Sequence, residues 1–196
     1  MKKLVLAVTA ATAAIAVATP AFAAAPSGAR IEGMVGYDRT SIDLDEFGLP
    51  GFDLKAEGVV FGIGAGYDMA LGEDVALGVD VEATETTADV GFSEGTDAAE
   101  ISFGRDLYAG FRLTVPAGES MNMYLKAGYT NARVKGETTD AGVTESASGN
   151  LDGVRAGLGL QFAVGANSYV GVEYRYSNYE ADVIRHQGML NFGFRF

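Results

Sequence analysis

The sequence predicts an all-β fold, an eight-stranded antiparallel up-and-down transmembrane β-barrel. Three observations support this prediction. After Ala25, no apolar run approaches the ~20 residues that a membrane-spanning helix needs. Instead, apolar and polar side chains alternate in eight segments of roughly ten residues, which is the length of a tilted membrane strand. The connections between these segments are alternately short and long, an asymmetry typical of membrane-spanning barrels.

The first four segments place apolar side chains at every second position, with glycine or charged residues between them. This alternation puts the two sets on opposite faces of a strand. The apolar faces are Ile31, Val35 and Tyr37; Val59, Phe61, Ile63, Ala65 and Tyr67; Val75, Leu77, Val79 and Val81; and Ile101, Phe103, Leu107, Ala109, Phe111 and Leu113. Arg105 does not fit the alternation of the fourth segment.

The last four segments repeat the pattern. Their apolar faces are Met123, Leu125, Ala127 and Tyr129; Val154, Ala156, Leu158, Leu160 and Phe162; Val170, Val172, Tyr174 and Tyr176; and Leu190, Phe192, Phe194 and Phe196. His186 is the second misfit, and the pattern places it on the lipid-facing side near the outer end of the last strand.

The opposite faces combine glycine with charges of both signs. A soluble β-sandwich also alternates, but its strands are shorter and its polar face looks to water. Eight strands enclose a lumen about wide enough for side chains to fill, so we expect these charges to pair across a closed interior. The predicted ion network of the barrel interior is Arg30, Glu32, Asp80, Glu82, Asp106, Arg112, Lys126, Arg155, Glu173, Arg175, Arg185 and Arg195.

Aromatic side chains gather toward the segment ends, as in the girdles of membrane barrels. One candidate girdle consists of Tyr37, Phe103, Tyr129, Tyr174 and Tyr176. The other consists of Tyr67, Phe111, Phe162, Tyr169, Phe194 and Phe196. The segments are therefore expected to cross the membrane between the two girdles.

The connections indicate how the barrel is oriented. Three are short, at residues 68–74, 116–120 and 165–168; three are long, at residues 40–54, 86–99 and 135–149; and one near residues 178–183 is intermediate. Both termini fall on the side of the short turns. We therefore expect periplasmic termini and extracellular long loops.

Residues 1–23 are predicted to be a secretory signal peptide. Lys2 and Lys3 form a basic start, residues 4–18 are mainly Ala, Val and Leu, and Ala21-Phe22-Ala23 offers small residues for cleavage. A transmembrane anchor is the alternative, but the run is shorter than the ~20 residues required. Residues 24–196 then form a single barrel domain.

Three stretches carry a resemblance to a known family. They are Gly157-Leu158-Gly159-Leu160-Gln161-Phe162, Val172-Glu173-Tyr174-Arg175-Tyr176 and Asn191-Phe192-Gly193-Phe194-Arg195-Phe196. The chain resembles the small outer-membrane β-barrels of Gram-negative bacteria, which include the opacity-like proteins and the OmpA-like N-terminal barrels of the porin family. The resemblance implies that Phe192, Phe194 and Phe196 act as an assembly signal for the barrel-assembly machinery.

No constellation in the sequence predicts catalysis, a cofactor or a metal. Gly91 to Gly95 matches G-x-S-x-G, but no helix follows Ser93 as that motif requires. His186 is the only histidine, and Gly188 offers it no hydroxyl partner. The segment from Asp43 to Leu54 imitates a calcium loop but lacks two of its ligands.

Charge narrows the choice of partners. The chain has 14 basic and 26 acidic residues, a net charge of −12, so a nucleic-acid partner is not expected. It has no cysteine, which excludes disulfides and thiol chemistry. The acidic long loops are either a solvated surface or carboxylates that bridge to anionic lipopolysaccharide through Ca²⁺ or Mg²⁺.

The sequence thus predicts a monomeric, non-enzymatic outer-membrane protein with a structural or surface-interaction function, a closed interior and acidic extracellular loops. Expected partners are outer-membrane lipid, lipopolysaccharide and, during insertion, the assembly machinery. Three alternatives remain open at this point: a narrow porin-like channel for small solutes, an outer-membrane lipid-modifying enzyme, and a soluble periplasmic lipocalin-like binder.

Signal cleavage is expected directly after Ala23, because Ala21 and Ala23 suit a pocket that accepts small residues. N-terminal sequencing of the protein from the membrane fraction should therefore begin at Ala24. A sequence that begins at Met1 would contradict export by this segment.

Overall fold

The structure is a computed structural model that describes residues 24–43, 53–94, 97–140 and 142–196. The predicted signal peptide, residues 1–23, lies outside the described residues and stays a prediction. Most of the calcium-loop-like segment from Asp43 to Leu54 also lies outside them. Within the described part, no helix is long and apolar enough to cross a membrane.

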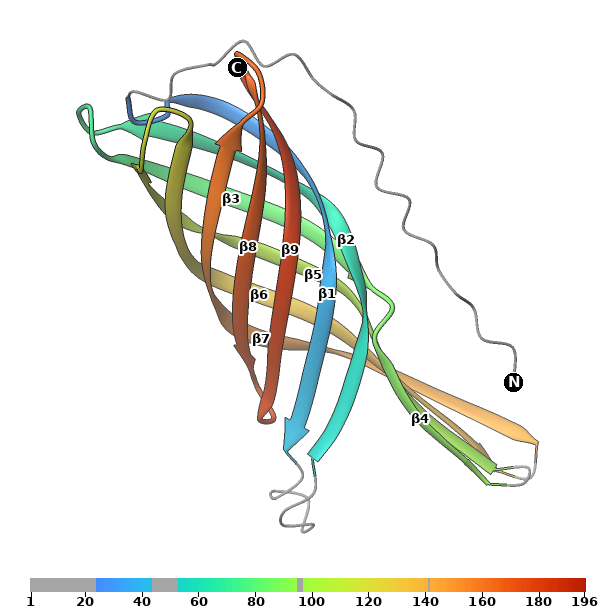
Figure 1. Ribbon diagram of the computed structural model, residues 1–196. Coiled ribbons are helices and arrows are strands. Elements are labelled where there is room, and N and C mark those ends of the chain that lie inside the picture. The colour runs from blue at the N-terminus through green and yellow to red at the C-terminus, as the bar shows by residue number, and fades with distance from the viewer. Residues whose placement is uncertain (1–23, 44–52, 95–96, 141) are drawn as a thin grey trace.

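In the described residues, nine antiparallel strands form one sheet, and all but β4 close into a ring (Figure 1). The strands are β1 (Gly28–Asp43), β2 (Asp53–Ala70), β3 (Ala76–Thr86), β4 (Asp89–Glu94), β5 (Asp97–Pro116), β6 (Met121–Asp140), β7 (Val143–Ala163), β8 (Ser168–Tyr179) and β9 (Val183–Arg195). Each strand of the ring pairs with its neighbours in chain order. The predicted all-β, eight-stranded up-and-down barrel is confirmed.

The first and last strands close the ring. Their register runs from Arg30 opposite Arg195 to Ile42 opposite Val183. On its other edge, β1 pairs with β2 along its whole length. Backbone groups in hydrocarbon have no water to bind, so closure supplies the partners that an open sheet edge would lack.

The outer face of the ring is an apolar band. Side chains along β3 alternate strictly between buried and exposed. Ile63 exposes 69% of its surface and Phe111 exposes 65%. At one end of the band, the same face continues with the exposed polar residues Arg39, Glu57 and Glu85. An apolar surface this extensive suits contact with lipid rather than with water.

The two ends of the barrel differ (Figure 1). At one end, here called the turn end, short turns join β2 to β3, β5 to β6 and β7 to β8. At the opposite end, the loop end, β5, β6 and β7 extend past the ring and, with β4, form a projecting sheet. This projecting sheet consists of residues 89–94, 97–103, 133–140 and 143–151.

The projecting sheet corrects the expectation of two long loops. Residues 86–99 contain β4, which pairs with β5 from Asp89 opposite Ser102 onward. In the second of these ranges, residues 135–140 and 143–149 form the distal part of a hairpin that pairs as far as Asp140 opposite Val143. Pairing continues past the membrane because the barrel beneath already holds these strands in register.

A β-bulge in β5 corrects the expected faces of Ile101 and Phe103. The register with β6 shifts between Phe103 and Asp106. An extra residue in one strand breaks the alternation of faces. Phe103 is therefore buried on the inner side instead of joining a lipid-facing girdle. Arg105 stays exposed on the outer face, where it donates to Asn131 Oδ1 at 3.1 Å.

Val81→Arg should destabilise the barrel by about 2–4 kcal/mol, because it puts a charge in the middle of the apolar band. Val81 is 57% exposed, and its register partners Ala65 and Ala109 are apolar. Unfolding in lipid vesicles measures the loss. Glu85→Arg, on the same face of β3 but outside the band, is the control and should cost far less; equal losses would show that the band does not face lipid.

Candidate functional site in the barrel interior

The structure places the twelve residues of the predicted ion network inside the barrel. Eleven of them expose 5% of their surface or less, and the side chain of Arg195, near the turn end, exposes 12%. Each of these side chains lies on the inner face because it alternates along its strand with the apolar side chains of the band. The network consists of three contacting groups along the barrel.

The group nearest the turn end is built around two arginines. Arg112 donates from Nε to Asp80 Oδ2 at 2.8 Å, and its Nη2 lies 3.1 Å from Glu32 Oε2. Arg30 contacts Asp80 and also Asp68 of β2. Each guanidinium thus joins two carboxylates that belong to different strands, which ties the wall together across the lumen.

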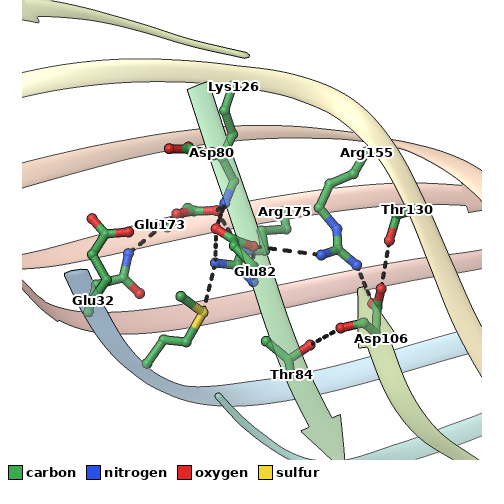
Figure 2. A network of polar contacts seen from close by, with 12 residues as sticks. Glu32, Asp80, Glu82, Thr84, Asp106, Lys126, Thr130, Arg155, Glu173 and Arg175 are labelled. Atoms are coloured by element: carbon green, nitrogen blue, oxygen red, sulfur yellow. Dashed lines mark hydrogen bonds and ion pairs between the residues drawn. The ribbon is translucent and has the colours of Figure 1, made fainter. Parts of the chain in front are cut away.

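The middle group joins two cations to two shared carboxylates (Figure 2). Lys126 lies between Glu82 and Glu173, with Nζ 2.7 Å from Glu173 Oε1. Arg175 contacts the same two carboxylates, with Nη1 3.2 Å from Glu82 Oε2. Sharing both partners lets each cation stay paired although neither meets bulk water.

The group nearest the loop end centres on Asp106. Its carboxylate accepts from Arg155 and, at 3.0 Å, from Arg185 Nη1. The Thr130 hydroxyl donates to the same carboxylate at 2.6 Å (Figure 2). Arg185 also donates from Nε to Asp38 Oδ1 at 2.8 Å. These donors replace the water that the Asp106 carboxylate loses inside the barrel.

Two members of the network were missed by the sequence analysis, Asp38 and Asp68. Both are fully buried. Asp68 was assigned to a turn, and Asp38 lay beyond the end of its segment. The alternation with a period of two indicates both residues. Asp38 lies two positions after Gly36 and Asp68 lies two positions after Gly66, which keeps both on the inner face.

The two added carboxylates balance the interior charge. Among the described residues, seven cationic and seven anionic side chains now share the lumen. The cations are Arg30, Arg112, Lys126, Arg155, Arg175, Arg185 and Arg195, and the anions are Glu32, Asp38, Asp68, Asp80, Glu82, Asp106 and Glu173. The formal charge of this set is zero, whereas the twelve predicted residues alone would carry an excess of positive charge.

Tyr169 was assigned to a lipid-facing girdle, and the structure corrects this. Its side chain is buried, and its hydroxyl donates to Glu32 Oε1 at 2.7 Å. The position has the same parity as Gly171 and Glu173, which face inward. Tyr124 is a second buried phenol: its ring lies 4.2 Å from the Arg112 guanidinium carbon, and its hydroxyl donates to Glu173 at 2.7 Å.

Glycines on β2 make room for the long ionic side chains. A Cβ at Gly66 would lie 2.5 Å from Arg30 Nη2 and 2.6 Å from Asp80 Oδ1. A Cβ at Gly64 would lie 3.0 Å from the Met34 methyl group. The space over this wall is therefore occupied by side chains from the neighbouring strands.

An apolar cluster lies above the network at the loop end. Its buried members are Ala56, Ala88, Phe103, Ala132, Tyr179 and Val183. Tyr179 connects the apolar cluster to the ion network, because its hydroxyl donates to Asp106 Oδ2 at 2.8 Å. The charged groups thus end beneath an apolar layer at the loop end, here called the apolar cap.

The remaining sequence candidates lie elsewhere. Phe192, Phe194 and Phe196 are exposed on the outer face toward the turn end. His186 is on the outer face and contacts Tyr174 and Tyr176. The Ser93 side chain lies outside the described part. In the part that is described, no group of three or more His, Cys, Asp or Glu side chains is arranged to hold a metal ion.

A closed barrel with an apolar exterior and a charged interior defines a transmembrane β-barrel protein. The family model for the outer membrane protein beta-barrel domain matches residues 9–196. The chain belongs to this family, and its location is the outer membrane. This confirms the resemblance to small outer-membrane barrels that the sequence indicates. No curated protein sequence matches the chain.

Solved structures support the same fold. The attachment invasion locus protein Ail of Yersinia pestis has 20% sequence identity and a TM-score of 0.55, and the match covers 87% of this chain and 100% of Ail. Neisserial surface protein A has 16% identity and a TM-score of 0.57, and the match covers 87% of this chain and 98% of that protein.

Asp106→Asn should lower the free energy of unfolding by about 3–5 kcal/mol, because it leaves Arg155 and Arg185 buried with one carboxylate fewer. Urea unfolding in vesicles measures the change. Glu85→Gln, which removes a carboxylate from the exposed face, should change stability by no more than about 0.5 kcal/mol. Comparable effects of both substitutions would mean that Asp106 is solvated as a surface group is.

Proposed function

We propose that the chain is a non-enzymatic surface protein with a closed interior, and that its loop end faces the cell exterior. The observation that carries this proposal is the charge-balanced network in the lumen. Every cation in it touches a carboxylate, and glycine positions are filled by neighbouring side chains. Moving an ion through this lumen would require breaking contacts whose members have no solvent to replace them.

The apolar cap supports closure at the loop end. Phe103, Tyr179 and Val183 are each 4% exposed and converge over the last ionic group. An ion entering from that end would first leave water for an apolar layer, which is costly. The cap and the network therefore oppose conduction by two different means.

The projecting sheet supports the surface-interaction part of the proposal. β8 pairs with β7 only from Gly153 onward, so residues 143–151 form an outer edge that pairs with β6 alone in the described structure. Nearly all side chains along this edge are exposed. An unpaired strand edge offers main-chain donors and acceptors to an extended segment of another protein.

The proposal includes the expected partners. Acidic side chains near the loop end, among them Asp140 and Glu145, are exposed and are suited to bridging lipopolysaccharide through divalent cations. The exposed aromatic row that ends at Phe196 is suited to recognition by the assembly machinery. A complete ring needs no second copy, which favours a monomer.

The absence of catalysis is part of the proposal as well. His186 is held by two tyrosines, and within the described residues no hydrogen bond joins it to a serine hydroxyl. A narrow channel is the second candidate function, and one observation favours it. The side-chain amides of Asn122 and Gln187 are buried in the lumen with no hydrogen-bond partner within the described residues. Such groups are suited to lining a file of water.

Planar-bilayer recording decides between closure and conduction. The folded protein, checked by heat-modifiable gel mobility, should show little or no steady conductance. A stable open level that changes with Glu82→Ala inside the lumen, but not with Glu85→Ala on the outer face of the same strand, would favour the channel instead.

A further inference from the structure

The outer face has a hollow over Gly188 of β9, at the loop-end border of the apolar band. A Cβ built on Gly188 meets no atom within 4 Å. The register partners of Gly188 are Tyr174 of β8 and Tyr37 of β1, which are 51% and 52% exposed. Gly188 is thus an open floor between two aromatic side chains.

His186 lies on the loop-end side of this hollow. The Tyr174 hydroxyl is 2.6 Å from His186 Nδ1. The ring of Tyr176 packs edge-on against the imidazole, with centroids 5.3 Å apart. These two contacts orient the imidazole. When the Tyr174 hydroxyl donates to Nδ1, the ring proton is on Nε2, which can then donate to a ligand.

Arg39 adds a positive charge beside the hollow. It is the register partner of His186 across β1 and β9. Its side chain is 47% exposed, and its ion pair with Glu57 is long, with 3.7 Å between Nε and Oε1. A guanidinium held so loosely has N–H groups free to turn toward an anion.

An apolar groove of about 590 Å³ continues from the hollow along the lipid-facing wall. It is lined by Tyr174, Gly188, Leu190, Val172, Leu160 and Met123, among others. A molecule that fills both parts must therefore be hydrocarbon in the groove and polar at the hollow. The lipids that surround the barrel have this division.

We propose that the hollow and the groove together bind a phosphate-bearing membrane lipid. The phosphate accepts hydrogen bonds from Arg39 and from His186 Nε2, and the headgroup rests over Gly188 between Tyr37 and Tyr174. The acyl chain occupies the groove. Basic side chains at a membrane border favour anionic headgroups, and aromatic side chains favour the same depth. This inference goes beyond the proposed function, since it holds whether or not the lumen conducts.

The single histidine makes the site observable. Protein labelled with ¹³C at the histidine ring carbon Cε1 has one histidine signal in the NMR spectrum, from His186. The folded protein, in a neutral detergent free of phosphate, is titrated with a diacylglycerol phosphate, with the same diacylglycerol lacking phosphate, and with inorganic phosphate. The first titration should give a saturable shift of the His186 signal, and the other two should not.

Two other results would overturn the proposal. An equal response to the phosphate-free diacylglycerol would show that the site does not recognise phosphate. A saturable response to inorganic phosphate over the same concentrations would show that the groove and its acyl chain add nothing, and that the ligand is a free anion.

Two pairs of variants locate the binding. Arg39→Gln should weaken the binding about tenfold, the size expected for losing a hydrogen bond to a charged group, whereas Arg105→Gln on β5, at the same end, should not. Gly188→Leu should abolish the saturable shift by filling the floor. Gly33→Leu is its control, since Gly33 is a second exposed glycine with open space above it. If Arg39→Gln and Gly188→Leu both titrate like the unaltered protein, the site is wrong.

Discussion

A strand in hydrocarbon can satisfy its backbone only by pairing on both edges, so the sheet has to close, and closure at eight strands leaves a narrow interior. This constraint governs the rest of the structure. Long charged side chains that point inward lose most of their water, so each needs an opposite charge within contact. Arg112 between Glu32 and Asp80, and Lys126 between Glu82 and Glu173, show how the narrow space is used.

The interior changes character along the barrel. Charged groups occupy it from the turn end to Asp106, and apolar side chains replace them at the loop end. Tyr179 spans the change, with its hydroxyl on Asp106 and its ring in the apolar cap. A displacement of the cap would therefore disturb the nearest carboxylate as well. The apolar cap and the ionic group around Asp106 are therefore expected to open together rather than one at a time.

Alternation with a period of two was enough to predict the ring, the apolar band and twelve interior charges, because a strand that separates lipid from a packed lumen cannot break it. It does not say which charges meet, since parity determines the face and not the partner across the lumen. The alternation also failed to predict structure wherever a strand no longer has lipid on one face and the lumen on the other. The projecting sheet lies beyond the apolar band, so residues 135–140 and 143–149 lack alternation although they form strands. A different reason applies to Asp38, Asp68 and Tyr169. The alternation assigns all three correctly to the inner face, but they lie at strand ends, beyond the segments in which the alternation was recognised.

The bulge at Phe103 and Asp106 has a consequence for how the chain can vary. On β5, Leu107 and Ile101 have the same parity, yet one meets lipid and the other packs on the inner side. One inserted residue thus separates two parts of a single strand whose side chains face different surroundings. Below it, substitutions are constrained by the membrane and by the charges of the lumen. On the loop-end side of the bulge, residues of the projecting sheet are constrained only by their contacts with one another. The sequence of this sheet can therefore diverge while the barrel that carries it stays the same.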